Sequence, residues 1–432
     1  MPSAIVIGGG LAGLSAAAAL GGAGFRVEVF EARPFLGGRA TSFPLPAGGG
    51  ASEPIDNCQH ILLRCCVNLL DFYRRLGVQE SIRFYREFYF IEPGGRVSTL
   101  RRGALPAPLH FTESFLRMRF LSAGDKFAIA RGLMALRRER TRRTDLDRIT
   151  MLDWLLQKKQ PPRAIERFWR QVLVSAVNED VDRMAARHGF QVFWLGFLAR
   201  ADAYEMGVPA IPLGELYRAE LWRGVGDISL RLRCPVERLG PEGVTADGRV
   251  HTADSYICAL PFERLPGLGL PAPAFEHSPI TGIHLWFDRA VTDLPHATLL
   301  DRTIQWMFNK SEGRYVQLVV SASRELAAKS RAEVIALALD ELGEFFPRAR
   351  EARLEKAVVI KELRATFSAA PGTEALRPEP ETGRPDLFLA GDWTRSGWPA
   401  TMEGAVRSGY RAAEAVTAAS GRPARFLAPD IA

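Results

Sequence analysis

Three glycines near the start of the chain have the spacing of a phosphate-binding turn. Gly8, Gly10 and Gly13 satisfy the pattern G-x-G-x-x-G. The first glycine permits a tight turn, the second lets the backbone approach a pyrophosphate, and the third lets a helix pack against a strand. A helix beginning at Leu11 and Ala12 would direct free N–H groups and a partial positive charge at the phosphates. The turn therefore predicts a dinucleotide site.

The elements around this turn support the prediction. Residues 4–7 are predicted as a strand, residues 11–20 as a helix and residues 26–30 as a second strand. Glu31 ends the second strand, about 20 residues beyond the glycines, where a carboxylate can accept hydrogen bonds from ribose hydroxyls. Ala32, directly after it, is expected to contact the nucleotide as well.

A second unit of this kind closes the chain. Residues 386–390 are predicted as a strand, Gly391 and Asp392 as a glycine turn, and residues 401–419 as a terminal helix. Because both ends carry nucleotide-type signals, we expect one domain to contain both ends of the chain. The middle of the chain would then form a second domain that covers it.

The middle of the chain has two kinds of pattern. Residues 68–205 are predicted to be mostly helical, whereas four short strands between 236 and 260, separated by glycine turns, predict a small β-meander. Further strands are predicted near 284–287 and 316–321, before a helix over about 331–346.

Composition limits the classes of function. The 432 residues are 47% hydrophobic and 24% charged, as in folded globular proteins. A net charge of +7 permits attraction to anionic lipid or nucleic acid without requiring either. The basic residues are spread along the chain and no nucleic-acid-binding module is present, so we expect no nucleic-acid partner.

The five cysteines predict neither disulfides nor a metal site. They form no C-x-x-C pair and have no zinc-ligand spacing, which is typical of a reducing compartment. No signal peptide precedes the first strand, and no apolar run reaches the length of a membrane span. We therefore expect a cytoplasmic protein, either free or bound to the inner face of the cell membrane.

Residues 114–143 bear on the membrane question, because apolar side chains and arginines alternate there. One interpretation is an ordinary solvated helix face. The other is an interfacial helix whose apolar side enters lipid while its arginines contact phosphates.

The segment after Glu31 indicates which dinucleotide is bound. Gly37, Gly38 and Arg39 resemble the GGR motif of the flavin-containing amine oxidase and phytoene desaturase superfamily. The resemblance implies FAD as the cofactor, with this segment along its pyrophosphate and ribityl chain.

The resemblance extends to the end of the chain, and it implies further roles there. Asp392 would contact the ribityl or pyrophosphate region, and the backbone of Val236 would lie against the adenine. Met402 would lie at the N-terminus of a helix directed at the pyrimidine end of the flavin. A helix N-terminus there would stabilise the negative charge of a reduced flavin.

A narrower resemblance begins at Ile55. Residues 55–63 resemble the D-N-G-Q-H segment of the hydroxysqualene dehydroxylases, FAD-dependent enzymes of bacterial hopanoid pathways, although Cys58 and Arg64 stand where glycines are expected. Three other stretches carry the same resemblance: residues 168–179, 208–213 and 397–404. We interpret Gln59 and His60 as candidates for the reactive face of the flavin. His60 would donate a proton to a departing hydroxyl, and the alternative is a structural histidine.

The resemblance implies the reaction and the partners. Reduced flavin N5 would give hydride to an allylic carbon of hydroxysqualene, yielding squalene and water, and an unidentified electron donor would reduce the FAD. The apolar isoprenoid substrate favours lipid over water by on the order of 20 kcal/mol, so the enzyme would collect it by peripheral membrane contact. The alternatives are a carotenoid-type desaturase, an amine oxidase, or a flavin-carrying, membrane-docked protein without catalysis.

The same resemblance implies an α/β fold with a Rossmann-like FAD-binding domain and a β-meander, plus a mixed α+β substrate domain. The expected FAD-binding domain is discontinuous and comprises residues 1–75, 206–270 and 360–420. The expected substrate domain, facing the membrane, comprises residues 76–205 and 271–359. Residues 421–432 are expected to be a loosely ordered tail.

Overall fold

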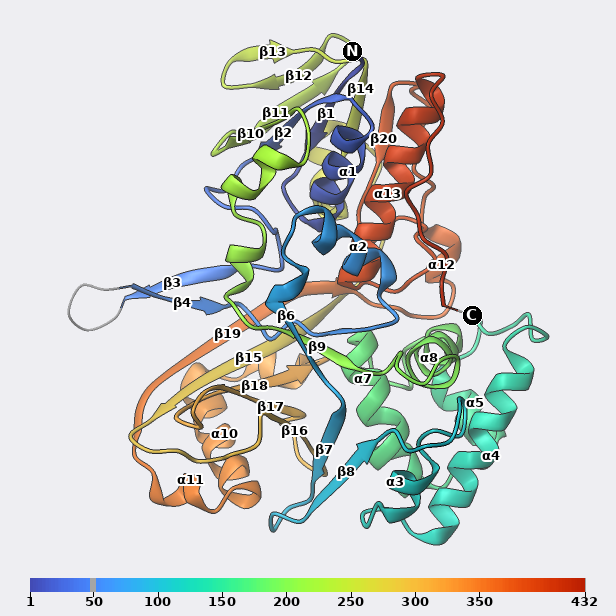
Figure 1. The fold of residues 1–432 in the computed structure, drawn as a ribbon, viewed down its shortest axis with the longest axis vertical. Helices are drawn as coiled ribbons and strands as arrows, with labels where there is room; N and C mark the ends of the chain where they lie inside the picture. The colour runs from blue at the N-terminus through green and yellow to red at the C-terminus, as the bar shows by residue number, and fades with distance from the viewer. Residues whose placement is uncertain (47–51, 432) are drawn as a thin grey trace.

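In the computed structural model, which describes residues 1–46 and 52–431, a parallel sheet contains strands from both ends of the chain (Figure 1). All its neighbouring strands pair in parallel. Parallel strands covered on both faces are typically short and apolar, as β1, β14 and β20 are, whereas the two strands toward the β10 edge also contain charged residues. In spatial order the strands are β10 (Ile228–Leu232), β2 (Arg26–Glu31), β1 (Ser3–Ile7), β14 (Ser255–Cys258) and β20 (Leu387–Leu389).

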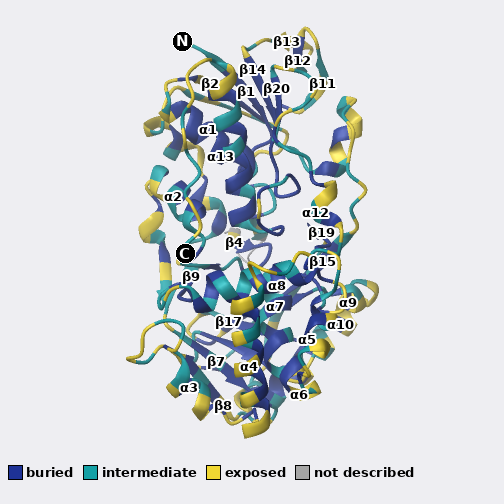
Figure 2. Cartoon of the chain, turned by 90° about the vertical axis from the view of Figure 1, so that its right-hand side faces the viewer, coloured by how far each residue is buried: buried dark blue, intermediate teal, exposed yellow. Residues whose placement is uncertain are grey.

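Two helices from opposite ends of the sequence pack beside this sheet. Helix α1 (Leu11–Gly22) contains five alanines and is buried along almost its whole length, so α13 (Met402–Ala419) can approach it closely. Figure 2 shows the two helices side by side, and their buried residues belong to one hydrophobic core. Helix α2 (Val67–Arg75) joins the same core. The expectation that the two ends of the chain come together is confirmed.

The predicted β-meander has three strands rather than four. Strands β11 (Val236–Gly240), β12 (Gly243–Ala246) and β13 (Arg249–His251) form an antiparallel sheet. The fourth expected strand, β14, lies in the parallel sheet between β1 and β20. All four of its residues are buried, as the centre of a covered sheet requires, and sequence alternation alone could not assign it to either sheet.

A larger, mainly antiparallel sheet lies below the parallel sheet in Figure 1. The prediction that residues 68–205 are mostly helical missed two of its strands, and the later chain contributes three more that were not expected. In order the strands are β19 (Leu354–Phe367), β15 (His277–Phe287), β18 (Tyr315–Ser321), β17 (Trp306–Ser311), β16 (His296–Leu299), β7 (Glu87–Ile91) and β8 (Val97–Arg101). Helices α9 (Arg324–Ala328), α10 (Arg331–Phe345) and α11 (Arg348–Glu351) follow β18.

Helices from the middle of the chain pack against the larger sheet on the side away from α9, α10 and α11. They are α3 (Thr112–Arg117), α4 (Ala123–Glu139), α5 (Met151–Gln157), α6 (Pro162–Ala164), α7 (Gln171–Val177) and α8 (Ala186–Phe193). Ser122 and Thr150 begin α4 and α5 as parts of capping boxes, in which each hydroxyl accepts a backbone N–H of the first turn. Asn178 ends α7 in the left-handed conformation.

Short strands and one short helix connect these parts. The strands β3 (Ser42–Pro46) and β4 (Ser52–Asp56) form a hairpin, while β5 (Leu62–Leu63), β9 (Met206–Pro209) and β6 (Ile82–Tyr85) form a small sheet. Helix α12 (Thr373–Leu376) precedes β20.

The last residues of the described chain form no helix or strand, but they are anchored. The Asp430 carboxylate accepts hydrogen bonds from Trp398 Nε1 at 3.0 Å and from Arg407 Nη1 at 2.9 Å. The Ala428 N–H donates to Asn68 Oδ1 at 2.8 Å. Across the described ranges, no helix combines the length and the apolar character needed to cross a membrane.

Candidate active site

A cavity of about 720 Å³ begins beside the turn between β1 and α1 and continues toward the larger sheet. Twelve of the thirteen residues predicted to bind the cofactor line this cavity, together with Gln59 and His60. The twelve are Gly8, Gly10, Leu11, Ala12, Glu31, Ala32, Gly38, Arg39, Val236, Gly391, Asp392 and Met402. These residues come from five separate parts of the sequence, so the cavity combines distant segments of the chain.

Glycine occurs at each of the three positions of the first turn for a different physical reason. Gly8 has a φ of +112°, which disfavours any residue with a side chain. A Cβ on Gly13 would lie 2.0 Å from the carbonyl oxygen of Gly8, so Gly13 lets helix and strand pack. A Cβ on Gly10 would meet only the Cα of Gly38, at 3.9 Å. The protein itself therefore does not require glycine at position 10, and a bound pyrophosphate would.

The start of α1 has free backbone donors. Its first residue follows Gly10, which offers no side-chain cap, so N–H groups of the first turn remain available to an anion. Glu31 lies beside this turn and accepts hydrogen bonds from Gly9 N at 2.7 Å and Arg33 N at 2.8 Å. These bonds fix the carboxylate at the cavity wall, where remaining lone pairs can accept ribose hydroxyls.

An ion pair joins the two ends of the chain within the cavity. Arg39 Nη2 lies 2.6 Å from Asp392 Oδ2, and Arg39 Nη1 donates to the Ala365 carbonyl oxygen at 2.9 Å. Burial alone would lower the pKa of Arg39, but the nearby carboxylates, Asp392 foremost among them, together outweigh burial and raise this pKa above its ordinary value. The Arg39 guanidinium is thereby held charged at the cavity wall.

The N-terminus of α13 lies at the far end of this cavity. Thr401 caps the helix, since its hydroxyl accepts the Gly404 N–H at 3.0 Å. The next residue, Met402, lines the cavity and leaves its backbone N–H outside the helical hydrogen-bond pattern. A partial positive charge at this position suits an anionic reduced flavin.

Gln59 and His60 lie on the cavity wall between these features. Lys310 Nζ donates to Gln59 Oε1 at 3.0 Å and also lies 3.3 Å from Asp56 Oδ2. His60 Nδ1 donates to the Cys58 carbonyl oxygen at 3.0 Å, so a neutral ring has its acceptor at Nε2. Burial lowers the pKa of His60, which keeps the ring neutral near pH 7. This geometry favours an accepting or orienting role over proton donation.

Two residues replace the glycines that the narrower resemblance expects. Neither Cys58 nor Arg64 has a positive φ, so the backbone at these positions accepts a side chain without strain. Arg64 Nε donates to Glu205 Oε2 at 2.5 Å, which joins the chain after β5 to the chain before β9. The two departures are therefore compatible with the site.

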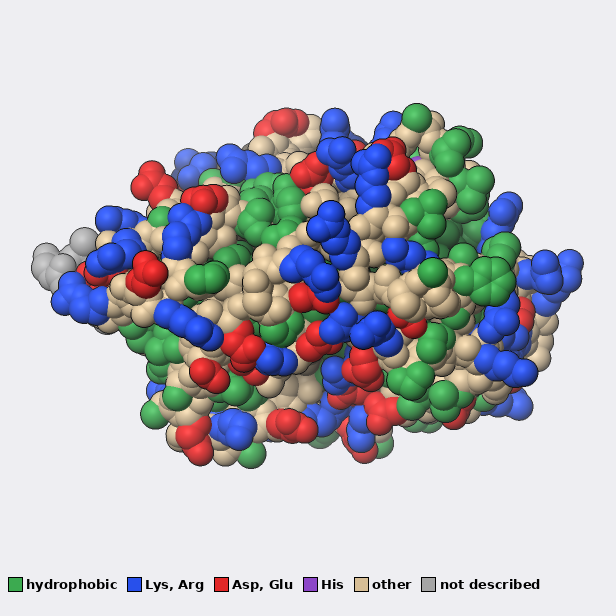
Figure 3. Space-filling model, turned by 90° about the horizontal axis from the view of Figure 1, so that it is seen from below, with side chains coloured by type: hydrophobic (Ala, Val, Ile, Leu, Met, Phe, Trp, Pro, Cys, Tyr) green, Lys and Arg blue, Asp and Glu red, His purple; other side chains and the backbone are tan. Residues whose placement is uncertain are grey.

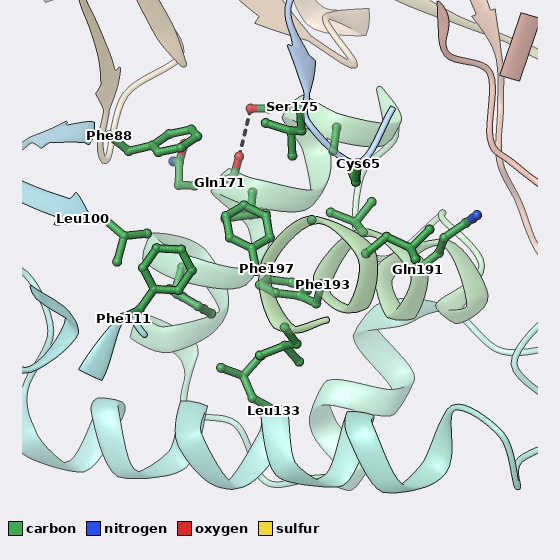
Figure 4. Close-up of a pocket in the computed structure, with 18 of the residues that line it drawn as sticks. Cys65, Phe88, Leu100, Phe111, Leu133, Gln171, Ser175, Gln191, Phe193 and Phe197 are labelled. Carbon is green, nitrogen blue, oxygen red and sulfur yellow. Dashed lines mark hydrogen bonds between the residues drawn. The ribbon is translucent and has the colours of Figure 1, made fainter. Parts of the chain in front are cut away.

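A second, apolar cavity of about 550 Å³ meets the first (Figure 4). Its lining is mostly apolar and includes five phenylalanines from β7, α8 and the segments beside α3, α7 and α8: Phe88, Phe111, Phe168, Phe193 and Phe197. Six residues line both cavities and therefore mark their junction: Ile61, Ser175, Ala176, Trp306, Thr401 and Met402.

Sequence reasoning did not identify the junction residues Ser175 and Trp306 or the neighbouring Gln171 as functional. Trp306 Nε1 donates to Ser175 Oγ at 2.7 Å, and this hydroxyl donates to the Gln171 carbonyl oxygen at 2.8 Å. Trp306 begins β17, a strand without a clear sequence signal. The sequence signals for Gln171 and Ser175 are their spacing of one helical turn and their place in the 168–179 stretch of the narrower resemblance.

The residues present fit FAD along the whole first cavity. The Gly10 space and the α1 N-terminus suit the pyrophosphate, Glu31 suits a ribose, and Val236 lies where an adenine would extend. The α13 N-terminus then lies at the end where the cavity meets the apolar one. A redox-active ring at this end would face an apolar space.

Comparison with known proteins agrees with this reading of the cavity. The family described as flavin containing amine oxidoreductase matches residues 11–417. The chain is 30% identical to the hydroxysqualene dehydroxylase of Rhodopseudomonas palustris, over 96% of this chain and 98% of that one. It is 26% identical to the zeta-carotene desaturase of Synechocystis sp., over 96% and 97% of the two chains. An oxidoreductase from Methanosarcina mazei has a similar fold, with a TM-score of 0.72, 20% identity and coverage of 94% and 98%.

Proposed function

The chain belongs to the flavin containing amine oxidoreductase family and binds FAD, and from this premise we propose that it reduces hydroxysqualene to squalene. The observation that carries this proposal is the apolar cavity that meets the flavin site at Met402 and Trp306. Such a cavity suits a hydrocarbon chain. The relatives whose names include hydroxysqualene dehydroxylase, at 28–30% identity over nearly the whole chain, support the choice of substrate.

The proposed reaction breaks one carbon–oxygen bond. The allylic hydroxyl takes up one proton that comes ultimately from solvent and leaves as water, and the electron-poor carbon that remains shares its positive charge over the double bond. FAD, when bound and reduced, supplies the hydride that forms the new carbon–hydrogen bond.

The chain's own residues would contribute positioning, electrostatics and exclusion of water. The aromatic wall of the apolar cavity would hold the polyene and keep water from recapturing the carbon as an alcohol. The α13 N-terminus would stabilise negative charge on the cofactor. The neutral ring of His60 would accept a hydrogen bond at Nε2 and thereby orient a water or the departing oxygen.

Anaerobic turnover tests the proposal. Purified enzyme, reduced chemically and given hydroxysqualene, is expected to produce squalene, detected by mass, with one squalene per reduced flavin. The matched control is the same enzyme left oxidised, which should produce none. Absence of squalene from flavin-loaded, fully reduced enzyme would contradict the proposal.

A carotenoid-type desaturation is the second candidate, because zeta-carotene and phytoene desaturases are also relatives over nearly the whole chain. It uses the same apolar cavity but removes hydride from the substrate. Oxidised enzyme given phytoene or zeta-carotene and a quinone would then form products with longer conjugation and red-shifted absorption. This result, together with no squalene in the anaerobic assay, favours the desaturase.

We further propose that the apolar cavity receives its substrate from a membrane surface. Leu109 and Met134 line this cavity and are also 58% and 61% exposed, so the cavity reaches the surface between them. Leu116 and Phe127 are exposed nearby, at 61% and 70%. Isolated exposed apolar residues are ordinary, but a group of them around an apolar entrance suits contact with lipid.

Basic residues surround this entrance and complement anionic lipid. We call the exposed apolar and basic residues of α3, α4 and their flanking loops the entrance face. Figure 3 views the lower end of the molecule, where apolar and basic side chains are interleaved. The entrance face has seven exposed arginines from residue 117 to residue 142: Arg117, Arg119, Arg131, Arg137, Arg138, Arg140 and Arg142. Apolar insertion combined with arginine–phosphate contacts is the expected mode of a peripheral membrane surface on the cytoplasmic side.

A further inference from the structure

Two polar side chains in the wall of the apolar cavity have no hydrogen-bond partner. Gln171 Oε1 and Thr298 Oγ1 are buried atoms that contact no donor or acceptor within residues 1–46 and 52–431. Gln171 is 9% exposed and Thr298 1% exposed, and both residues line the apolar cavity. Buried polar groups in proteins are nearly always paired, so two unpaired ones in a single apolar cavity need an explanation.

Strand pairing and one hydrogen bond link the segments that carry these two side chains. Thr298 of β16 is the cross-strand partner of Trp306 in β17, so both side chains lie on one face of the sheet. Trp306 Nε1 donates to Ser175 Oγ, and Ser175 follows Gln171 by one turn of α7. Figure 4 shows Gln171 and Ser175 together beside Phe88, above the aromatic part of the cavity.

The neighbouring serine does not satisfy either group, because it has no proton left for Gln171 Oε1 and makes no hydrogen bond with Thr298 Oγ1. Its hydroxyl accepts from Trp306 at 2.7 Å and donates to the Gln171 backbone carbonyl at 2.8 Å, so its proton is already used. Among the described residues that line this cavity, the buried polar atoms without a partner are thus one amide oxygen, which accepts, and one threonine hydroxyl, which can donate. A single alcohol group has the complementary pair, because its O–H donates and its oxygen accepts.

We infer that Gln171 and Thr298 form a hydroxyl-binding subsite that selects an isoprenoid alcohol over the corresponding hydrocarbon. The substrate O–H donates to Gln171 Oε1, and its oxygen accepts from Thr298 Oγ1. The subsite lies next to Ser175 and Trp306, which also line the flavin cavity, so an alcohol held there has its carbinol carbon near the junction. This inference rests on the proposed function in its choice of an alcohol as ligand.

Ligand binding without turnover tests the subsite. Oxidised, FAD-loaded enzyme is titrated with hydroxysqualene and with squalene in the same micelles, and the change in flavin absorbance gives both dissociation constants. Partition into the micelles affects wild type and variants equally, so the ratio of the two constants can be compared between proteins. We expect wild type to bind the alcohol about tenfold more tightly than the hydrocarbon, because squalene leaves both polar groups unpaired.

Two variants and one control make the result specific. Gln171→Leu is expected to reduce the preference for the alcohol to about onefold while squalene binding is kept or improved, and Thr298→Val to reduce it to about threefold. The control is Gln191→Leu: Gln191 lines the same cavity, but its amide already donates to the Gly397 carbonyl oxygen at 2.9 Å. It should retain the wild-type preference. If Gln171→Leu does not retain flavin, the reduced preference of Thr298→Val for the alcohol tests the subsite instead.

The outcomes separate this inference from the proposed reaction. A wild-type enzyme without preference for the alcohol, or a Gln171→Leu enzyme that keeps the preference, overturns the subsite even if reduced enzyme produces squalene. A preference that depends on Gln171 supports the subsite even if reduced enzyme produces no squalene, and in that case the proposed reaction alone is overturned.

Discussion

At the scale of single residues, the glycines of the cofactor turn differ in what requires them: the fold requires some, and a bound ligand would require another. Gly13 is required by the packing of α1, because a Cβ there would lie 2.0 Å from a carbonyl oxygen. Gly10 has open space where its Cβ would lie and a φ of −81°, which any residue can adopt. The two positions therefore make opposite predictions about stability and cofactor binding.

Gly10→Ala is expected to fold and to lose FAD. Its free energy of unfolding without flavin should stay within about 0.5 kcal/mol of wild type. Its FAD affinity should fall at least about tenfold, because the added methyl group occupies the space of the pyrophosphate. Thermal unfolding with and without FAD, together with a fluorescence titration, measures both effects. Gly13→Ala is the comparison and should be less stable even without FAD.

Glu403, in the first turn of α13, should make stability depend on pH. Burial raises its pKa from the ordinary 4.5 to about 7, although hydrogen bonds from Asn68 and Leu69 limit the rise. Between these values the native state holds a proton that the unfolded state has released, so stability falls as pH rises. Above about pH 7 both states are ionised and the loss is complete.

Glu403→Gln should remove this dependence. Relative to the variant, wild type is expected to lose about 3 kcal/mol of unfolding free energy between about pH 4.5 and 7. Chemical denaturation of both proteins at four pH values across this window measures the difference. A difference that stays constant over the window would show that Glu403 is ionised in the native protein throughout.

At the scale of secondary-structure elements, the sequence predicted those with strong local signals. Strand β1, helix α1 and strand β2 have a glycine turn, an alanine-rich helix and a β-branched strand in immediate succession. By contrast, β19 has many charged residues and only partial burial, so its 14 residues give no clear period. Its pairing with β15, more than 70 residues earlier, determines that it is a strand.

The residues of the site likewise divide into those with a local sequence signal and those that only the tertiary fold brings together. The cofactor residues occur in short motifs, and their types and spacing predicted them. Gln171, Ser175, Thr298 and Trp306 come from α7, β16 and β17, and only the tertiary fold makes them neighbours. The resemblance to enzymes of apolar substrates implied an apolar cavity, but no local pattern connects α7 with β16 and β17, so the residues of the polar wall could not be predicted.

At the entrance face, an exposed residue of helix α4 allows a test of membrane binding. Phe127→Glu is expected to reduce binding to vesicles containing anionic lipid severalfold, since it replaces an exposed apolar side chain with one that lipid phosphates repel. Co-sedimentation with vesicles of neutral and anionic lipid measures this. Val250→Glu, on β13 at the opposite end of the molecule, changes a similarly exposed residue and should bind like wild type. Equal loss in both variants would indicate only a nonspecific charge effect.

At the scale of the whole molecule, the two cavities divide the chemistry between the two parts of the fold. The parallel sheet, α1, α13 and the loops beside them provide most of the cofactor cavity, and the helices from the middle of the chain, with strands of the larger sheet, provide much of the apolar cavity. The parts meet at six shared residues, including Met402 from one part and Trp306 from the other. The relative position of the two parts therefore sets the distance between the cofactor and the reacting carbon.

The position of β20 and α13 in the sequence has a consequence for synthesis on the ribosome. The sheet that β1 begins is completed only when residues 387–419 have emerged. At about 5 to 20 residues per second, the first strand waits roughly 20 to 80 seconds for its last neighbours. Ribosome-arrested chains that stop before Leu387 should accordingly retain no flavin, whereas chains that present α13 fully outside the exit tunnel should retain it. Flavin loading would then be the event that ends biogenesis, and a cell short of riboflavin would accumulate unfinished protein for its proteases.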